Sequence, residues 1–201
     1  AAKERVFDNL GAGDLAVVSV DDAWCRSVAA RCEGRGLRTC ELSVEREPDS
    51  ACAAFLRRDT LVVRLDGVEH ALLDRSDLKI FGLHNAQNAL AAASVALELG
   101  ASPERVRDGL ASFSPIEHRI EPAGEVGGVR YVNDSKATNT DSVEKALTAF
   151  DAGTVVVLLG GHDKMTDLSS LADAVCARCR VAVCFGEAGP RIACALERAR
   201  D

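Results

Sequence analysis

Two short stretches in the second half of the chain place charged and hydroxyl side chains directly after apolar runs. They are NDSKATN at 133–139 and GGHDK at 160–164. In open parallel sheets, ligands bind at the carboxyl ends of the strands, so Lys136 and Lys164 would lie near the same ligand. Two ammonium groups favour an anionic ligand, which gains about 1.5–3 kcal/mol per charge-assisted hydrogen bond.

Asp134 and Thr138 would lie between these two lysines. A simpler explanation is that Thr138 or Asn139 caps a following helix and that Lys136 is a solvated loop residue. The second stretch opens with the glycines 160–161, which would allow the backbone to approach a ligand closely. Because two such stretches each carry a lysine, we favour the ligand-binding interpretation.

Three further side chains suit a nucleotide. Arg119 follows His118 near the middle of the chain and could hold a phosphate when two units close, although a linker salt bridge would also explain it. Asn85 and Asn88 open an Ala-rich segment. Asn85 could be a helix N-cap, whereas Asn88 lies one turn in, where Asn is unfavourable, so its amide could contact an adenine edge or water. The chain contains no G-x-x-x-x-G-K-[ST] phosphate loop.

The apolar patterns predict the elements that would position these residues. The first part is expected to contain strands at 15–20 and 37–44, a hairpin at 60–65 and 68–73, and helices at 22–33, 85–99 and 103–113. The second part is expected to contain a hairpin at 120–132, strands at 154–159 and 181–185, and helices at 141–150, 168–179 and 190–200. Strands that alternate with helices predict an α/β fold with a mainly parallel sheet covered on both faces.

Composition limits the class of protein. The chain has 201 residues, 47% of them apolar, and a net charge of −7, which argues against a nucleic-acid or membrane-surface binder. We see neither an apolar run long enough for a membrane span nor a secretory signal. Of the eight cysteines, only Cys176 and Cys179 have the C-x-x-C spacing, and nothing completes a zinc site. We expect buried or half-buried free thiols and a cytoplasmic location.

These motifs together resemble those of the Mur ligases, the ATP-dependent amide ligases that build the peptidoglycan peptide. Residues 82–92, GLHNAQNALAA, are similar to the G-x-H-N-x-x-N-x-x-A-A helix of the family, and His118-Arg119 is similar to the motif that opens its C-terminal domain. NDSKATN and GGHDK resemble the branch that adds D-glutamate. The resemblance covers essentially the whole chain.

The resemblance implies two domains. Residues 1–115 would be the C-terminal part of the central ATP-binding domain, and residues 116–201 a truncated Rossmann-like domain for D-glutamate. A UDP-binding domain, the phosphate loop, a carbamylated lysine and the Mg²⁺-binding His and Glu would precede residue 1, and a Ser-x-x-x-x-x-Phe region would follow residue 201. The chain alone is therefore expected to be inactive and to hold no metal.

The resemblance also implies roles for individual residues. The candidate ATP contacts are Asn85, Asn88, Arg119 and Asp134. The candidate D-glutamate contacts are Lys136, Thr138 and Lys164. The candidate catalytic residues are Arg119, Lys136 and Lys164. ATP would phosphorylate the carboxylate of UDP-N-acetylmuramoyl-L-alanine, and the amine of D-glutamate would attack the resulting acyl phosphate, with Mg²⁺ as cofactor. A monomer is expected.

Two alternatives remain open at this point. The chain could belong to a folylpolyglutamate-type or another Mur-type ligase, which an assay of several amino acids would distinguish. It could also be a non-catalytic module that binds a nucleotide or a partner.

Overall fold

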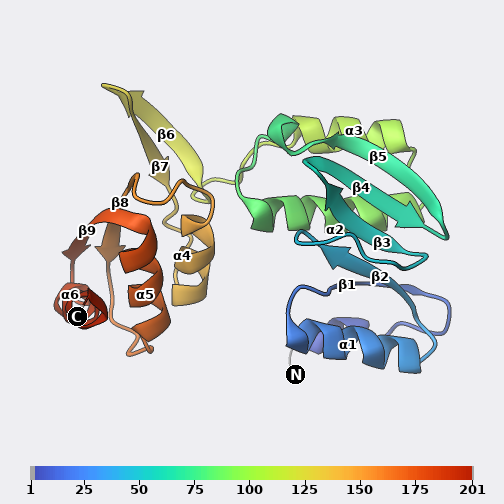
Figure 1. Ribbon diagram of the computed structural model, residues 1–201, viewed down its shortest axis with the longest axis horizontal. Coiled ribbons are helices and arrows are strands. Elements are labelled where there is room, and N and C mark those ends of the chain that lie inside the picture. Colours follow the sequence, from blue (N-terminus) through green and yellow to red (C-terminus); the bar gives the residue numbers. More distant parts are fainter. Residues whose placement is uncertain (1–2, 201) are drawn as a thin grey trace. The chain divides into compact units, whose positions relative to one another are not determined.

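The computed structural model describes residues 3–200, which form two units, one ending at Ser114 and the other beginning at Pro115. The first unit contains a five-stranded sheet, in which β1, β2 and β3 are parallel and β4 and β5 join antiparallel in the order β1-β2-β3-β4-β5 (Figure 1). Its strands are β1 (Leu15–Ser19), β2 (Arg38–Ser43), β3 (Ala53–Arg57), β4 (Thr60–Leu65) and β5 (Val68–Asp74). Its helices are α1 (Ala23–Gly34), α2 (Leu83–Glu98) and α3 (Pro103–Ser112), with short 3-10 turns at Lys3–Phe7 and Arg75–Asp77.

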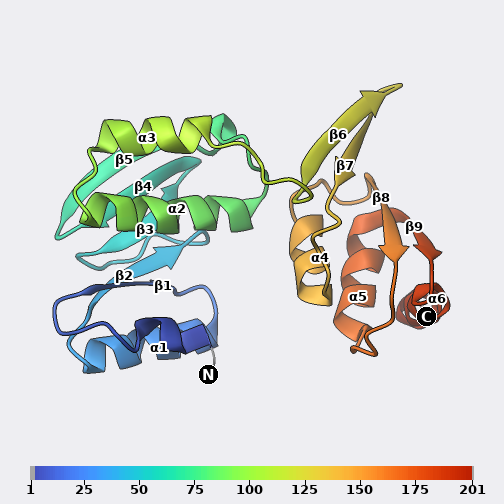
Figure 2. The same cartoon turned by 180° about the vertical axis from the view of Figure 1, so that it is seen from behind.

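Helices cover both faces of this sheet, with α1 on one face and α2 and α3 on the other, as the two opposite views show (Figures 1 and 2). The side chains of β1 alternate accordingly, since Ala16 and Val18 pack in the cluster under α1 while Leu15 and Val17 pack in the cluster under α2. The larger cluster contains Leu90, which is fully buried.

Local signals explain several boundaries of the first unit. The side chain of Asp22 caps α1 by accepting a hydrogen bond from the amide of Cys25 at 2.8 Å. Ser102 caps α3 with Pro103 at its start. Asp66 and Gly67 join β4 to β5 with positive φ angles of 49° and 82°, as a type I′ turn requires.

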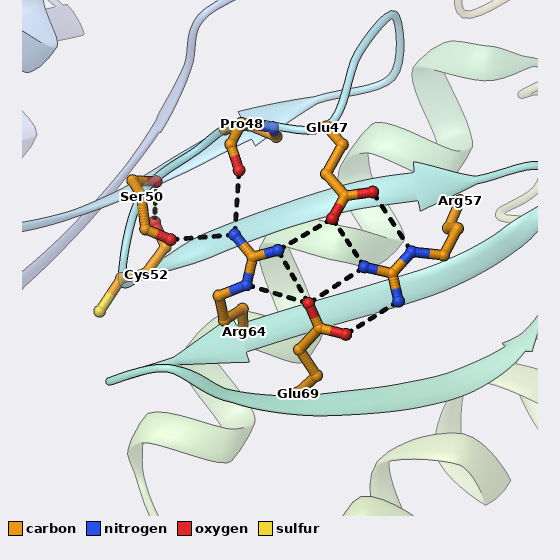
Figure 3. A network of polar contacts seen from close by, with 7 residues as sticks. All are labelled: Glu47, Pro48, Ser50, Cys52, Arg57, Arg64 and Glu69. Atoms are coloured by element: carbon orange, nitrogen blue, oxygen red, sulfur yellow. Dashed lines mark hydrogen bonds and ion pairs between the residues drawn. The ribbon is translucent and has the colours of Figure 1, made fainter.

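A charged network covers a small apolar cluster on the antiparallel strands β3 and β4. The cluster consists of Ala53, Phe55 and Val62. Figure 3 shows the guanidinium groups of Arg57 and Arg64 alternating with the carboxylates of Glu47 and Glu69, with nitrogen–oxygen contacts of 2.6–2.9 Å. Both guanidinium groups lie over the ring of Phe55, at 5.3 and 5.2 Å from its centroid, and that ring is fully buried. The network thus excludes water from Phe55 and contributes cation–π attraction.

The second unit contains an antiparallel hairpin and a parallel strand pair, which are separate sheets. The hairpin strands are β6 (Glu121–Val126) and β7 (Val129–Asn133), and the parallel strands are β8 (Val155–Gly160) and β9 (Cys179–Phe185). The helices are α4 (Thr140–Leu147), α5 (Ser169–Arg178) and α6 (Gly189–Arg200).

The three helices of the second unit pack on one face of the β8–β9 pair. The core there includes Leu159, Leu171, Val175 and Ile192. Alternate side chains point the other way and are exposed: Val156, Leu158, Val181, Val183 and Phe185. The alternation of buried and exposed side chains follows from the two-residue period of the strands.

The observed fold confirms the predicted α/β class with parallel strand pairing. The predicted hairpin at 120–132 is present as β6 paired with β7. Two details differ from expectation. The strand β3 was not predicted, and it turns the chain back into β4, with which it pairs antiparallel. The β8–β9 pair is covered by helices on one face, whereas cover on both faces was expected.

Candidate functional site

The loop after β7 is shaped by its own polar side chains. Asn139 caps α4, because its Oδ1 accepts a hydrogen bond from the amide of Ser142 at 2.8 Å. The amide of Ser135 donates to Oδ1 of Asn133 at 3.1 Å, and the amide of Ala137 donates to the carbonyl of Asp134 at 2.9 Å. The simpler explanation thus holds for Asn139. Lys136 and Thr138 are exposed, which both explanations allow.

Asp134 supports the segment that carries Arg119. Its Oδ1 accepts a hydrogen bond from the amide of Ile120 at 3.1 Å, and the amide of Lys136 donates to the carbonyl of His118 at 3.0 Å. His118 and Ile120 have positive φ angles of 66° and 46°, which are uncommon for non-glycine residues and especially unfavourable for a β-branched residue such as Ile. The loop after β7 therefore holds Arg119 between two strained residues.

Glu121 and Asn133 complete this support. Oε2 of Glu121 accepts from the amide of His118 at 2.8 Å and from Nδ2 of Asn133 at 3.3 Å. Nδ2 of Asn133 also lies 2.8 Å from Nδ1 of His118. His118 thus shapes the loop while Arg119 is exposed beside it.

A direct contact joins the loops after β7 and β8. The Nζ of Lys164 donates to the carbonyl oxygen of Thr138 at 2.8 Å. A lysine ammonium has three N–H donors, so this contact leaves up to two for a ligand. The expected approach of the two stretches is therefore present for Lys164 and Thr138.

The first glycine of the GGHDK stretch, Gly160, has a packing role. A Cβ added to Gly160 would lie 2.2 Å from the carbonyl oxygen of Phe185, and one added to Gly186 would lie 3.0 Å from the amide nitrogen of Gly161. The ends of β8 and β9 approach each other at these residues. This contact, rather than the approach of a ligand, accounts for Gly160.

Two side-chain pairs that the sequence reasoning missed hold the loop after β8. Arg191 donates to both carboxylate oxygens of Asp163 at 2.7 Å, and Nδ1 of His162 lies 2.6 Å from Oε2 of Glu187. The Arg191 guanidinium holds the pKa of Asp163 below its usual range. The only available signal was an Arg directly after the Gly-Pro step that begins α6.

The asparagines of the first unit lie at the start of α2. The helix begins at Leu83 with Gly82 as N-cap, so Asn85 is not its cap. Instead, Nδ2 of Asn85 donates to the carbonyl of Phe81 at 2.7 Å, and Nδ2 of Asn88 lies 3.4 Å from Oδ1 of Asn85. Asn88 is exposed and available to a ligand.

Across residues 3–200, no group of three or more His, Cys, Asp or Glu side chains could hold a metal ion. Within the same residues, no helix is long and apolar enough to cross a membrane. Of the eight cysteines, six are buried or half-buried as expected, whereas Cys176 and Cys194 are exposed.

Two family models match nearly the whole chain. The Mur ligase middle domain matches residues 1–96, and the Mur ligase glutamate ligase domain matches residues 118–200. The chain belongs to the Mur ligase family. Within this Mur ligase chain, Asn85 and Asn88 fall in the region of the middle-domain match, and the loops after β7 and β8 fall in the glutamate ligase domain.

The Mur ligase chain is similar to UDP-N-acetylmuramoylalanine--D-glutamate ligases of several bacteria. It is 34% identical to the protein of Koribacter versatilis over 96% of this chain and 41% of that protein. It is 39% identical to the protein of Rhodopseudomonas palustris over 98% of this chain and 41% of that protein. The chain therefore spans about two fifths of the length of these relatives.

Solved structures share the fold. A pseudomurein peptide ligase type C from Methanothermus fervidus matches 99% of this Mur ligase chain and 48% of its own, with a TM-score of 0.70 and 13% identity. A folylpolyglutamate synthase from Mycobacterium tuberculosis matches 92% of this chain and 42% of its own, with a TM-score of 0.65 and 21% identity. At these identities the likeness concerns the fold.

Proposed function

We propose that this chain is part of an ATP-dependent ligase that joins D-glutamate to UDP-N-acetylmuramoyl-L-alanine in peptidoglycan precursor synthesis. The contact between Lys164 and Thr138 carries the proposal, because it brings together the two loops whose residues would bind D-glutamate. The names of the similar relatives support D-glutamate as the amino acid. The proposed protein is longer than this chain, monomeric and cytoplasmic.

The exposed ammonium groups of Lys136 and Lys164 would bind the carboxylates of D-glutamate. The hydroxyl of Thr138 would add a neutral hydrogen bond. These contacts would place the D-glutamate amine for attack, and positioning of this kind can contribute several kcal/mol to a bimolecular reaction. The hydrogen bond to Thr138 fixes Lys164 relative to the neighbouring loop before the substrate arrives.

The remaining candidates would contact ATP, the second substrate. Arg119 would bind its phosphates, since a guanidinium matches phosphate oxygens and stays charged. Asn85 and Asn88 would lie at the adenine. Asp134 would contribute through the Arg119 segment, which it supports by hydrogen bonding, as well as at the ribose.

The reaction would proceed in two steps. Transfer of the γ-phosphoryl group to the carboxylate of UDP-N-acetylmuramoyl-L-alanine releases ADP and forms an acyl phosphate. The D-glutamate amine then attacks the acyl carbon, and inorganic phosphate leaves as the amide forms. Mg²⁺ would screen the anionic charges. The described residues offer no set of ligands for it, so the contributions of this chain are those of its side chains.

Phosphate release by the full-length protein tests this function. We expect release in the presence of UDP-N-acetylmuramoyl-L-alanine, ATP and D-glutamate. We expect little release when L-alanine or diaminopimelate replaces D-glutamate, or when a folate and L-glutamate replace both UDP-N-acetylmuramoyl-L-alanine and D-glutamate. The 201-residue chain alone should give no turnover. Preference for another amino acid would refute the D-glutamate assignment, and turnover by the chain alone would refute its dependence on further domains.

A further inference from the structure

Arg191 lies outside the proposed substrate contacts but holds the loop that carries Lys164. Its side chain donates from Nε and one terminal nitrogen to the two oxygens of Asp163, each at 2.7 Å. Its other terminal nitrogen donates to the carbonyl of Thr166 at 2.8 Å. One guanidinium therefore binds the loop on both sides of Lys164.

The carboxylate of Asp163 passes this restraint on to the backbone. The amide of Met165 donates to Oδ1 of Asp163 at 2.8 Å, and Met165 has a positive φ of 54°. A non-glycine residue is held in this conformation only by its surroundings. Asp163 is 13% exposed, so its ion pair is better shielded from solvent than most surface pairs.

A second pair contributes less to the same loop. His162 and Glu187 are 78% and 62% exposed, and exposed ion pairs contribute little. The contact with Glu187 does, however, direct the His162 side chain towards the turn before α6. The contact with Arg191 directs the Asp163 side chain towards the start of α6. Lys164 reaches instead to the loop after β7.

We propose that Arg191 is a positioning residue for Lys164. It keeps the loop between β8 and α5 in the conformation that presents the Lys164 ammonium beside Thr138, and it acts through Asp163 and Thr166 without contacting substrate. The D-glutamate part of this inference rests on the function proposed above.

Kinetics of the full-length protein test the inference. Arg191→Lys keeps the charge but loses the planar fork, and Arg191→Ala loses both. We expect the KM for D-glutamate to rise about tenfold in both variants, while the KM for ATP stays within about twofold. Arg198→Ala is the matched control, because Arg198 is an exposed arginine on the same helix. An unchanged D-glutamate KM, or an equal rise for ATP, would overturn the inference.

A double-mutant cycle distinguishes positioning from a general effect on stability. If Arg191 acts through Asp163, the variant with both Asp163→Ala and Arg191→Ala should have the same D-glutamate KM as Arg191→Ala alone. Independent, multiplying effects of the two substitutions would contradict the proposed route.

Hydrogen exchange separates this inference from the function. In the full-length protein without substrates, the amides of peptides spanning residues 163–168 should exchange faster in Arg191→Ala than in the wild type. Their exchange rate should be the same in Arg198→Ala as in the wild type. Unchanged exchange in Arg191→Ala would refute the loop restraint. If exchange rises but the wild-type protein does not use D-glutamate, the proposed function fails while the role of Arg191 in holding the loop stands.

Discussion

The Nζ of Lys164 lies 2.8 Å from the carbonyl oxygen of Thr138, so a side chain of one loop is hydrogen-bonded to the backbone of the other. The carbonyl acceptor is neutral and leaves the charge of the ammonium group uncompensated. A bound carboxylate can therefore use that charge without displacing the contact that orients it.

Replacing Lys164 with alanine should impair the use of D-glutamate. Loss of a charge-assisted contact worth about 1.5–3 kcal/mol corresponds to a roughly ten- to hundredfold rise in the KM for D-glutamate. Steady-state kinetics of the full-length protein would measure it. Lys145→Ala is the control, since Lys145 forms an exposed pair with Asp141 on α4. Equal D-glutamate kinetics in Lys164→Ala and the wild type would remove Lys164 from the site.

Two substitutions of Asp134 should separate the effect of its hydrogen bond to the Arg119 segment from the effect of its negative charge. Asp134→Asn keeps an oxygen for the amide of Ile120, whereas Asp134→Ala does not. We expect faster amide exchange at Ile120 in the alanine variant and a larger rise in the KM for ATP than in the asparagine variant. If the KM for ATP rises equally in both variants, the carboxylate charge matters and the hydrogen bond to Ile120 does not. If it rises in neither, Asp134 does not contribute to ATP binding.

The charged network of the first unit should make stability depend on acid pH. Hydrogen bonds from Arg57 and then Arg64 lower the pKa of Glu69 from 4.5 to about 2. A lowered carboxyl pKa stabilises the folded state fully above pH 4.5, and this contribution is lost as the pH falls towards about 2. The urea midpoint of Glu69→Gln should fall less over this range than that of the wild type.

Glu45→Gln provides the control for that titration, because Glu45 is an exposed glutamate of the loop between β2 and β3. Its acid dependence should match the wild type. Parallel acid dependence of Glu69→Gln and the wild type would show that the network does not stabilise the fold.

Two leucines at opposite extremes of exposure should differ in their effect on stability. Leu90 is fully buried in α2, whereas Leu99, which follows that helix, is 82% exposed. Leu90→Ala should lower the free energy of unfolding by about 2–5 kcal/mol, and Leu99→Ala should change it by less than about 0.5 kcal/mol. Urea unfolding followed by fluorescence of Trp24 measures both. Similar losses of unfolding free energy in the two variants would contradict the placement of Leu90 in the core and of Leu99 at the surface.

Much of the fold could be predicted because its signals are local. Asp66-Gly67 specifies a turn with two positive φ angles, and Ser102-Pro103 specifies the start of a helix. The strand β3 escaped prediction, since its first residues, Ala53 and Ala54, are poor strand formers. Burial of Phe55 beneath two arginines, which only the tertiary structure provides, stabilises that strand.

The candidate site was predictable in its loops but not in their support. Residue types and strand ends indicated Lys164 and Thr138, and the structure brings them together. Nothing in the spacing indicated that Arg191, nearly thirty residues after Asp163, would bind it. Long-range ion pairs of this kind have no local sequence signal. The roles of Asn88 and Arg119 remain predictions.

The close approach at Gly160 has a consequence for mutational scanning. An alanine there would place its Cβ 2.2 Å from the carbonyl of Phe185, so every substitution should reduce abundance. At Gly109, by contrast, nothing lies within 4 Å of such a Cβ, and substitutions other than proline should be tolerated. A library scored by activity alone would assign Gly160 to the chemistry. Scoring protein abundance in parallel would show that Gly160 is needed for the close packing of the ends of β8 and β9.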